Sequence, residues 1–89
     1  MFTYTVNDRG NIELPQTFTE CLIKDLTFSI IVKQGRSEFQ LDVSEYDLQD
    51  ICKIANWVGQ LGCDLIVKDA HTVVIKYRWE VRYEHYRWL

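Results

Sequence analysis

The sequence predicts an α+β fold in which an antiparallel sheet carries one long α-helix packed on one face, approximately in the order β-β-β-β-α-β-β. Two patterns predict this class: residues 72–84 alternate between apolar and polar positions, and residues 45–61 carry apolar residues at three- and four-residue steps. An alternating strand needs one buried face, and an amphipathic helix lying across the sheet provides the cover.

Length and composition predict one globular domain over residues 1–89. A second core in an 89-residue chain would leave each half too small to offset the entropy of folding. The hydrophobic share of 47% and the charged share of 26% are typical of globular proteins. Because the first residues lack the pattern of a secretory leader and no stretch has the length of a membrane span, we expect a cytoplasmic protein with no membrane contact.

Two hairpins are expected in the first half of the chain. Bulky residues alternate with threonines from Phe2 to Val6 before the turn-forming residues 7–10, which predicts an N-terminal hairpin over 1–14. Alternation on both sides of a Gln-Gly-Arg turn predicts a second β-hairpin over 26–43. Residues 16–25 fit a short helix and irregular structure equally well, so their conformation stays open.

A helix is expected over residues 45–61. Ser44 has the side chain of an N-cap, and the acidic residues that follow favour the positive end of a helix. Gly62 can adopt the left-handed conformation that ends a helix. The apolar stripe expected to face the sheet consists of Leu48, Ile51, Cys52, Ala55, Val58 and either Leu61 or Gly62.

The last predicted element is a β-hairpin over 63–84, followed by an aromatic C-terminal end at 85–89. Alternation in its second strand assigns one set of residues to the inner face: Val73, Ile75, Tyr77, Trp79, Val81 and Tyr83. Because this final strand is long, it is expected to leave an unprotected sheet edge, through which two copies of the chain pair as a homodimer.

The sequence contains no pattern that predicts catalysis, a metal or a cofactor. Cys21, Cys52 and Cys63 form no Cys-x-x-Cys pair, which predicts reduced and mostly buried thiols. His71 and His85 have no second ligand at metal-binding spacing, and the glycines form no phosphate loop. We therefore expect a protein that is not an enzyme.

Two segments are candidates for contact with a partner. The first is acidic and contains no base: Glu38, Asp42, Glu45, Asp47 and Asp50. The second is the aromatic end with its arginine: Tyr86, Arg87 and Trp88. Tyrosine, tryptophan and arginine are enriched at interface hot spots. Each segment also has an ordinary interpretation, as a solvated strand edge and helix start, or as a chain end folded back on the core.

The leading functional hypothesis is a small non-catalytic protein-binding module that acts as an inhibitor or adaptor by occupying a partner surface. In general character the chain is similar to small acidic phage-encoded proteins that block CRISPR or restriction enzymes. That resemblance implies a nucleic-acid-processing partner with a basic surface, and phosphate mimicry by the acidic segment.

Three alternatives remain open. The first is a nucleic-acid-binding module that uses the basic residues Lys76, Arg78, Arg82 and Arg87, although the net charge of −3 disfavours nucleic acid as a partner. The others are a self-associating structural protein and a small enzyme whose nucleophile the sequence does not reveal.

Overall fold

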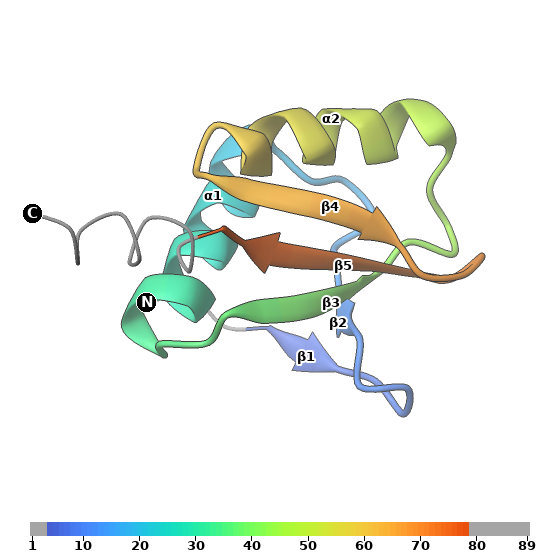
Figure 1. Cartoon of the computed structure of the whole chain (residues 1–89). Helices are drawn as coiled ribbons and strands as arrows, with labels where there is room; N and C mark the ends of the chain where they lie inside the picture. The colour runs from blue at the N-terminus through green and yellow to red at the C-terminus, as the bar shows by residue number, and fades with distance from the viewer. Residues whose placement is uncertain (1–3, 79–89) are drawn as a thin grey trace, which may run out of the picture.

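The computed structural model describes residues 4–78, which form a compact α+β fold with a mixed sheet and helices on one face (Figure 1). Five strands lie in the order β1-β2-β3-β5-β4 within this part of the chain. The strands are β1 (Thr5–Val6), β2 (Ile12–Glu13), β3 (Glu38–Asp42), β4 (Cys63–Val67) and β5 (Thr72–Tyr77). The helical elements are α1 (Glu20–Phe28), the π-helical turn η1 (Ser29–Lys33) and α2 (Leu48–Gly59).

The prediction of a first strand for the 26–43 hairpin is wrong, because residues 20–33 are helical. Buried side chains in this segment are spaced three and one residues apart, which is the helical period: Ile23, Leu26, Thr27, Ile30 and Ile31. Phe28 and Val32, which a strand would have buried, are 50% and 60% exposed. The helix begins at a Thr19 N-cap, whose hydroxyl accepts a hydrogen bond from the Leu22 amide at 3.1 Å.

The predicted purely antiparallel sheet is also wrong, because β2 runs parallel to β3, with Ile12 opposite Leu41 and Glu13 opposite Asp42. Parallel neighbours need a crossover connection, and α1 with η1 supplies it here. The N-terminal hairpin is confirmed in a short form, since β1 pairs antiparallel with β2. The observed order is therefore β-β-α-β-α-β-β, with two short helices in place of one long one.

Helix α2 is shorter than predicted and is turned about its axis relative to the expected stripe. Its N-cap is Asp47 rather than Ser44, because the Asp47 carboxylate accepts a hydrogen bond from the Asp50 amide at 2.9 Å. Ile54 and Val58 are fully buried, whereas Leu48 is 74% exposed. The apolar stripe of α2 is thus wider than the part of the helix surface that is covered by the sheet.

The last predicted hairpin is confirmed for β4 and β5, which pair antiparallel from Cys63 opposite Tyr77 to Val67 opposite Val73. Val73 and Ile75 are buried on the helix-covered face, as expected. The strand predicted beyond Arg78, including Trp79, Val81 and Tyr83, lies outside the described residues.

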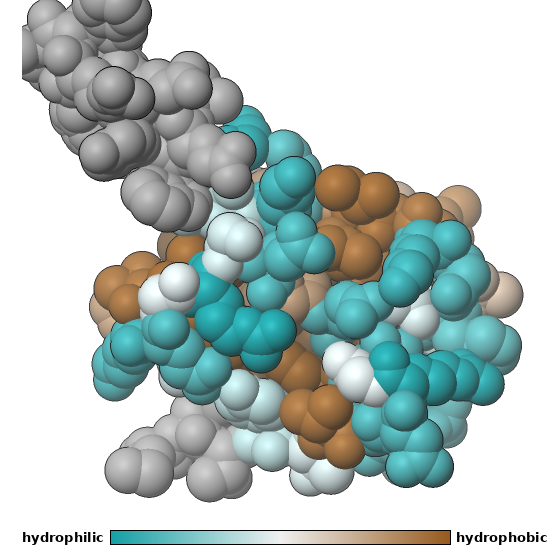
Figure 2. All heavy atoms as spheres, turned by 60° about the horizontal axis from the view of Figure 1, so that its bottom comes forward, coloured by the Kyte–Doolittle hydropathy of each residue, from teal (hydrophilic) through white to brown (hydrophobic). Residues whose placement is uncertain are grey.

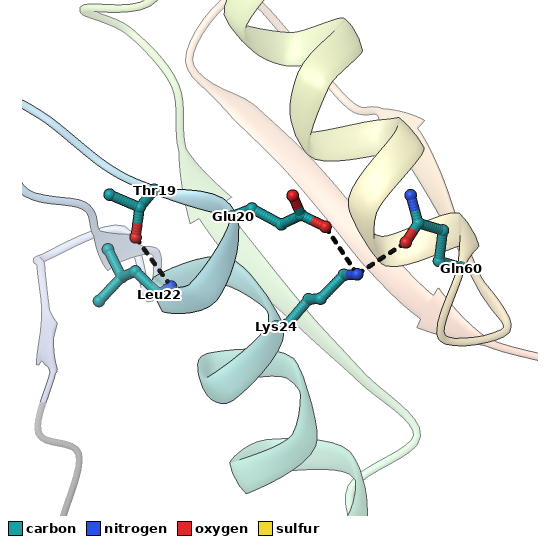
Figure 3. Close-up of polar contacts among 5 residues, drawn as sticks. All are labelled: Thr19, Glu20, Leu22, Lys24 and Gln60. Carbon is teal, nitrogen blue, oxygen red and sulfur yellow. Dashed lines mark hydrogen bonds and ion pairs between the residues drawn. The ribbon is translucent and has the colours of Figure 1, made fainter.

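The two helices are tied together at one end by Lys24 of α1 (Figure 3). Its ammonium contacts the Glu20 carboxylate one turn earlier at 2.7 Å and donates a hydrogen bond to the Gln60 side chain at 2.6 Å. The ring of Trp57 packs edge to face against Phe18, just before α1, with centroids 6.0 Å apart. These contacts define the side of α2 that faces α1.

Candidate protein-binding site

Four polar side chains fix the place where the β1–β2 turn meets β3 and β5. The amide nitrogen of Asn7 donates to the Asp42 carboxylate at 2.8 Å, and that of the buried Asn11 donates to the Thr72 hydroxyl at 2.7 Å. Asp42 lies opposite Thr72 in the β3–β5 pair. A buried polar group is costly unless it is paired, so this network specifies one position for the turn.

The carboxylate of Asp42 is held in its ionised form by these neighbours. Its Oδ1 atom accepts a hydrogen bond from the Ser44 amide at 3.0 Å and another from the Ser44 hydroxyl. The two bonds from Ser44 are the main cause of a lowered pKa for Asp42; the Asn7 amide and the positive charge of Arg9 lower it further. Ser44, expected as the cap of α2, thus serves Asp42 instead.

A pocket of about 240 Å³ opens beside this carboxylate. Its lining consists of Glu13, Leu14, Asp42, Ser44, Glu45 and Tyr46. Three of these six residues are acidic, and the parallel pairing of β2 with β3 is what brings Glu13 next to Asp42. We call this the acidic pocket.

Tyr46 forms a fixed wall of the acidic pocket. Its hydroxyl donates to the main-chain oxygens of Leu14 and Pro15, and its ring meets that of Phe18 edge to face with centroids 5.2 Å apart. The pKa of Tyr46 is raised, first by burial and then by the negative charges of Glu45, Asp50 and Asp42. Three carboxylates thus contribute negative charge near the ring.

No protein-family model, curated protein or solved structure matches this chain. Between Tyr4 and Arg78, no helix has both the length and the apolar character needed to cross a membrane.

The structure divides the predicted acidic segment. Asp42 and Glu45 line the acidic pocket, and Asp50 lies close enough to affect Tyr46. Asp47 is occupied as the cap of α2, and Glu38 lies at the far end of β3, opposite Lys76. The predicted Tyr86, Arg87 and Trp88 fall outside the described residues.

Sequence reasoning missed Glu13. Its position beside Asp42 depends on the parallel β2–β3 pairing, which the strand expected over residues 26–33 does not allow. The signal that could have found it is the helical spacing of Ile23, Leu26 and Ile30, because a helix between two strands indicates a parallel crossover.

The thiols do not match the expectation that most are buried, since Cys21 and Cys52 are exposed and Cys63 alone is buried. Burial raises the pKa of the Cys63 thiol to about 11, and the Asp25 carboxylate raises that of Cys21. A raised pKa reduces the thiolate that a nucleophile requires. Within residues 4–78, no group of three or more histidine, cysteine or acidic residues is placed to hold a metal ion.

The basic residues of the final strand that lie within residues 4–78 are placed beside acidic residues. Lys76 lies between Glu38 and Asp64 in the strand register, and the Arg78 guanidinium is 3.4 Å from the Asp64 carboxylate. Each of these two basic side chains thus has an acidic neighbour, which weakens the attraction between this part of the strand and a phosphate backbone.

Proposed function

We propose that this chain is a small non-catalytic protein-binding module, an inhibitor or adaptor that recognises a basic protein surface through the acidic pocket. The observation that carries the proposal is a surface hollow with three carboxylates around a rigid tyrosine wall. A single lysine or arginine side chain from a partner would place its charge among Glu13, Asp42 and Glu45 and its methylene stem against Leu14 and Tyr46.

The surroundings of the pocket suit such a contact. Asp42 and Tyr46 are both held by hydrogen bonds within the chain, so little side-chain freedom is lost when a partner binds. Acidic residues at a surface also raise the rate of encounter with a basic partner through electrostatic steering.

A finer version of this proposal is an anti-defence role in a phage, in which the acidic surface occupies the nucleic-acid site of a CRISPR or restriction enzyme. Its support is the negative field shared by Asp42, Glu45 and Asp50 around Tyr46. In that role, DNA and this chain would compete for the same basic surface of the partner.

The proposal is tested by titrating the isotopically labelled protein with a short arginine-rich peptide and following amide chemical shifts by NMR. We expect the largest shifts at Leu14, Glu45 and Tyr46. The double substitution Glu13→Gln and Glu45→Gln removes two pocket charges and is expected to weaken binding about fivefold to tenfold at low salt.

The matched control is the double substitution Glu20→Gln and Glu38→Gln, which removes the same charge at two exposed sites outside the pocket. It should leave the affinity within about twofold. If both double variants weaken binding equally, the peptide responds to net charge alone and the pocket has no specific role.

A further inference from the structure

Within residues 4–78, strand β4 lies at an edge of the sheet. The strand order places it last, next to β5 on one side only, and it is five residues long. The opposite edge, β1, has two residues and is too short to template another strand well. The edge expected at the final strand is not found at β5 in the described residues, since β5 lies between β3 and β4.

The backbone of β4 presents hydrogen-bonding groups at this edge. The Lys68 amide bonds to the Thr72 oxygen at 3.0 Å and the Arg78 amide to the Gly62 oxygen at 3.1 Å, so even-numbered residues of β4 face β5. The amides and carbonyls of Cys63, Leu65 and Val67 therefore point away from the sheet. Nothing in the described part of the chain forms a hydrogen bond with these groups.

Two apolar side chains of β4 are left in contact with water. Ile66 is 48% exposed on the outer face, and Val67 is 65% exposed on the face that bears the helices. At the opposite end of the sheet, seen from the side of β1 and β2, apolar atoms (brown) lie in separate areas among hydrophilic ones (Figure 2). The exposure of Ile66 and Val67 is what an edge strand shows before a neighbour is added.

We propose that β4 pairs antiparallel with β4 of a second copy of this chain, with Ile66 opposite Ile66 on the two-fold axis. The proposal is independent of the acidic pocket. The register follows from the sequence Asp-Leu-Ile-Val-Lys at 64–68, which is complementary to itself when reversed. Asp64 then faces Lys68 of the second copy, and Leu65 faces Val67, each contact occurring twice.

The backbone geometry is compatible with that register. Leu65 and Val67 carry the outward amides and carbonyls, so they form the hydrogen-bonded pairs of the new ladder. Asp64, Ile66 and Lys68 occupy the closer, non-hydrogen-bonded positions on the outer face, where side chains of opposite strands interact most strongly. Charges on an edge usually oppose pairing, but here each charge meets its opposite.

Helix α2 presents a matching surface on the same side. Trp57 and Gln60 face α1, so the opposite side of α2 carries Leu48, Cys52, Ala55 and Gly59. Leu48, Cys52 and Gly59 are exposed, and no atom lies within 4 Å of a Cβ built on Gly59. The row thus places one large apolar residue and three small ones beside the open edge.

The centre of the β4 edge and the centre of the exposed side of α2 lie at about the same height along the interface. Ile66 lies three residues beyond the start of β4, about 10 Å along a strand, which corresponds to about seven residues back along α2 from its end. The axis would therefore pass between Cys52 and Ala55. Two antiparallel copies of α2 would set Leu48 against Gly59 and Cys52 against Ala55, and these small residues permit the close approach that paired edge strands impose.

The decisive test exchanges charges between copies. Asp64→Lys and Lys68→Asp each place like charges opposite one another, so each variant alone should be monomeric in analytical ultracentrifugation at concentrations where the original chain is dimeric. When the two variants are mixed, both charge contacts are restored, and a heterodimer should form. Asp64 also contacts Arg78, and Lys68 contacts Gln40, so circular dichroism checks that each variant folds.

A second variant keeps the test decisive if either charge variant fails to fold. Ile66→Lys puts two ammonium groups at the axis and should abolish the dimer, raising the dimer dissociation constant at least tenfold. Val6→Lys is the matched control, because Val6 is a similarly exposed strand residue, at 53%, on the opposite edge. In a Cys21→Ser background, a short bismaleimide should link two copies through Cys52, since Cys63 is buried.

A chain that stays monomeric at high concentration overturns the proposal. So does a dimer that survives Ile66→Lys, or single charge variants that fold but form no heterodimer on mixing. Failure of these tests would leave the arginine-peptide result unaffected, since the acidic pocket lies at the ends of β2 and β3.

Discussion

Two apolar segments of this chain look alike in sequence and fold differently. Residues 72–77 alternate and form β5, whereas residues 26–33 also alternate and form the end of α1 with η1. Both segments place one apolar residue at a position that alternation assigns to water, Val74 in the first and Ile31 in the second, so alternation alone does not separate them. The second segment differs because it continues the helical spacing that begins at Ile23 and runs through Leu26 and Ile30. Alternation is informative only where no helical period runs through the same residues.

The largest expected effect is a loss of stability that distinguishes the helical period from the strand period of two within residues 26–33. Ile30→Ala should lower the free energy of unfolding by about 2 to 5 kcal/mol, because Ile30 is fully buried. Phe28→Ala should cost about 1 kcal/mol or less, since half of that side chain is already exposed. Urea unfolding measures both, and equal losses would mean that the segment buries its side chains as a strand does.

A smaller effect tests the start of the helix that alternation concealed. Thr19→Ala removes the hydroxyl that accepts from the Leu22 amide, and should lower the free energy of unfolding by about 1 kcal/mol. Thr17→Ala is the control, being exposed and outside the helix. A thermal shift shared equally by both variants would contradict the cap.

One misinterpreted segment accounts for both main errors in the predicted fold. With residues 26–33 as a strand, the sheet had to be antiparallel and α2 had to cover it alone. Once α1 is a helix, β2 and β3 become parallel neighbours and the second helix is in place. The hairpin of β4 and β5 was predictable because its contacts are local.

The candidate site was predictable only in part, for the same reason. Asp42, Glu45 and Asp50 are close in sequence, so their common field could be anticipated. Glu13 joins them through the parallel pairing, and the cap role of Asp47 depends on where α2 begins. Self-pairing was anticipated, but at the final strand; which strand lies at the edge is a property of the whole sheet order.

The smallest expected effect is a pH dependence of stability in the sheet, where Asp42 joins β3 to the β1–β2 turn. Its pKa is lowered in the folded chain, so its ionised form stabilises the fold above the ordinary aspartate pKa of about 3.9. This contribution is lost as the pH falls through the lower pKa of the folded state. Asp42→Asn should therefore cost about 0.5 kcal/mol at neutral pH, with the difference shrinking toward pH 2. Urea unfolding across this range, with Asp8→Asn as an exposed control, measures it; a difference that grew on acidification would show that the carboxylate is destabilised rather than held by Ser44 and Asn7.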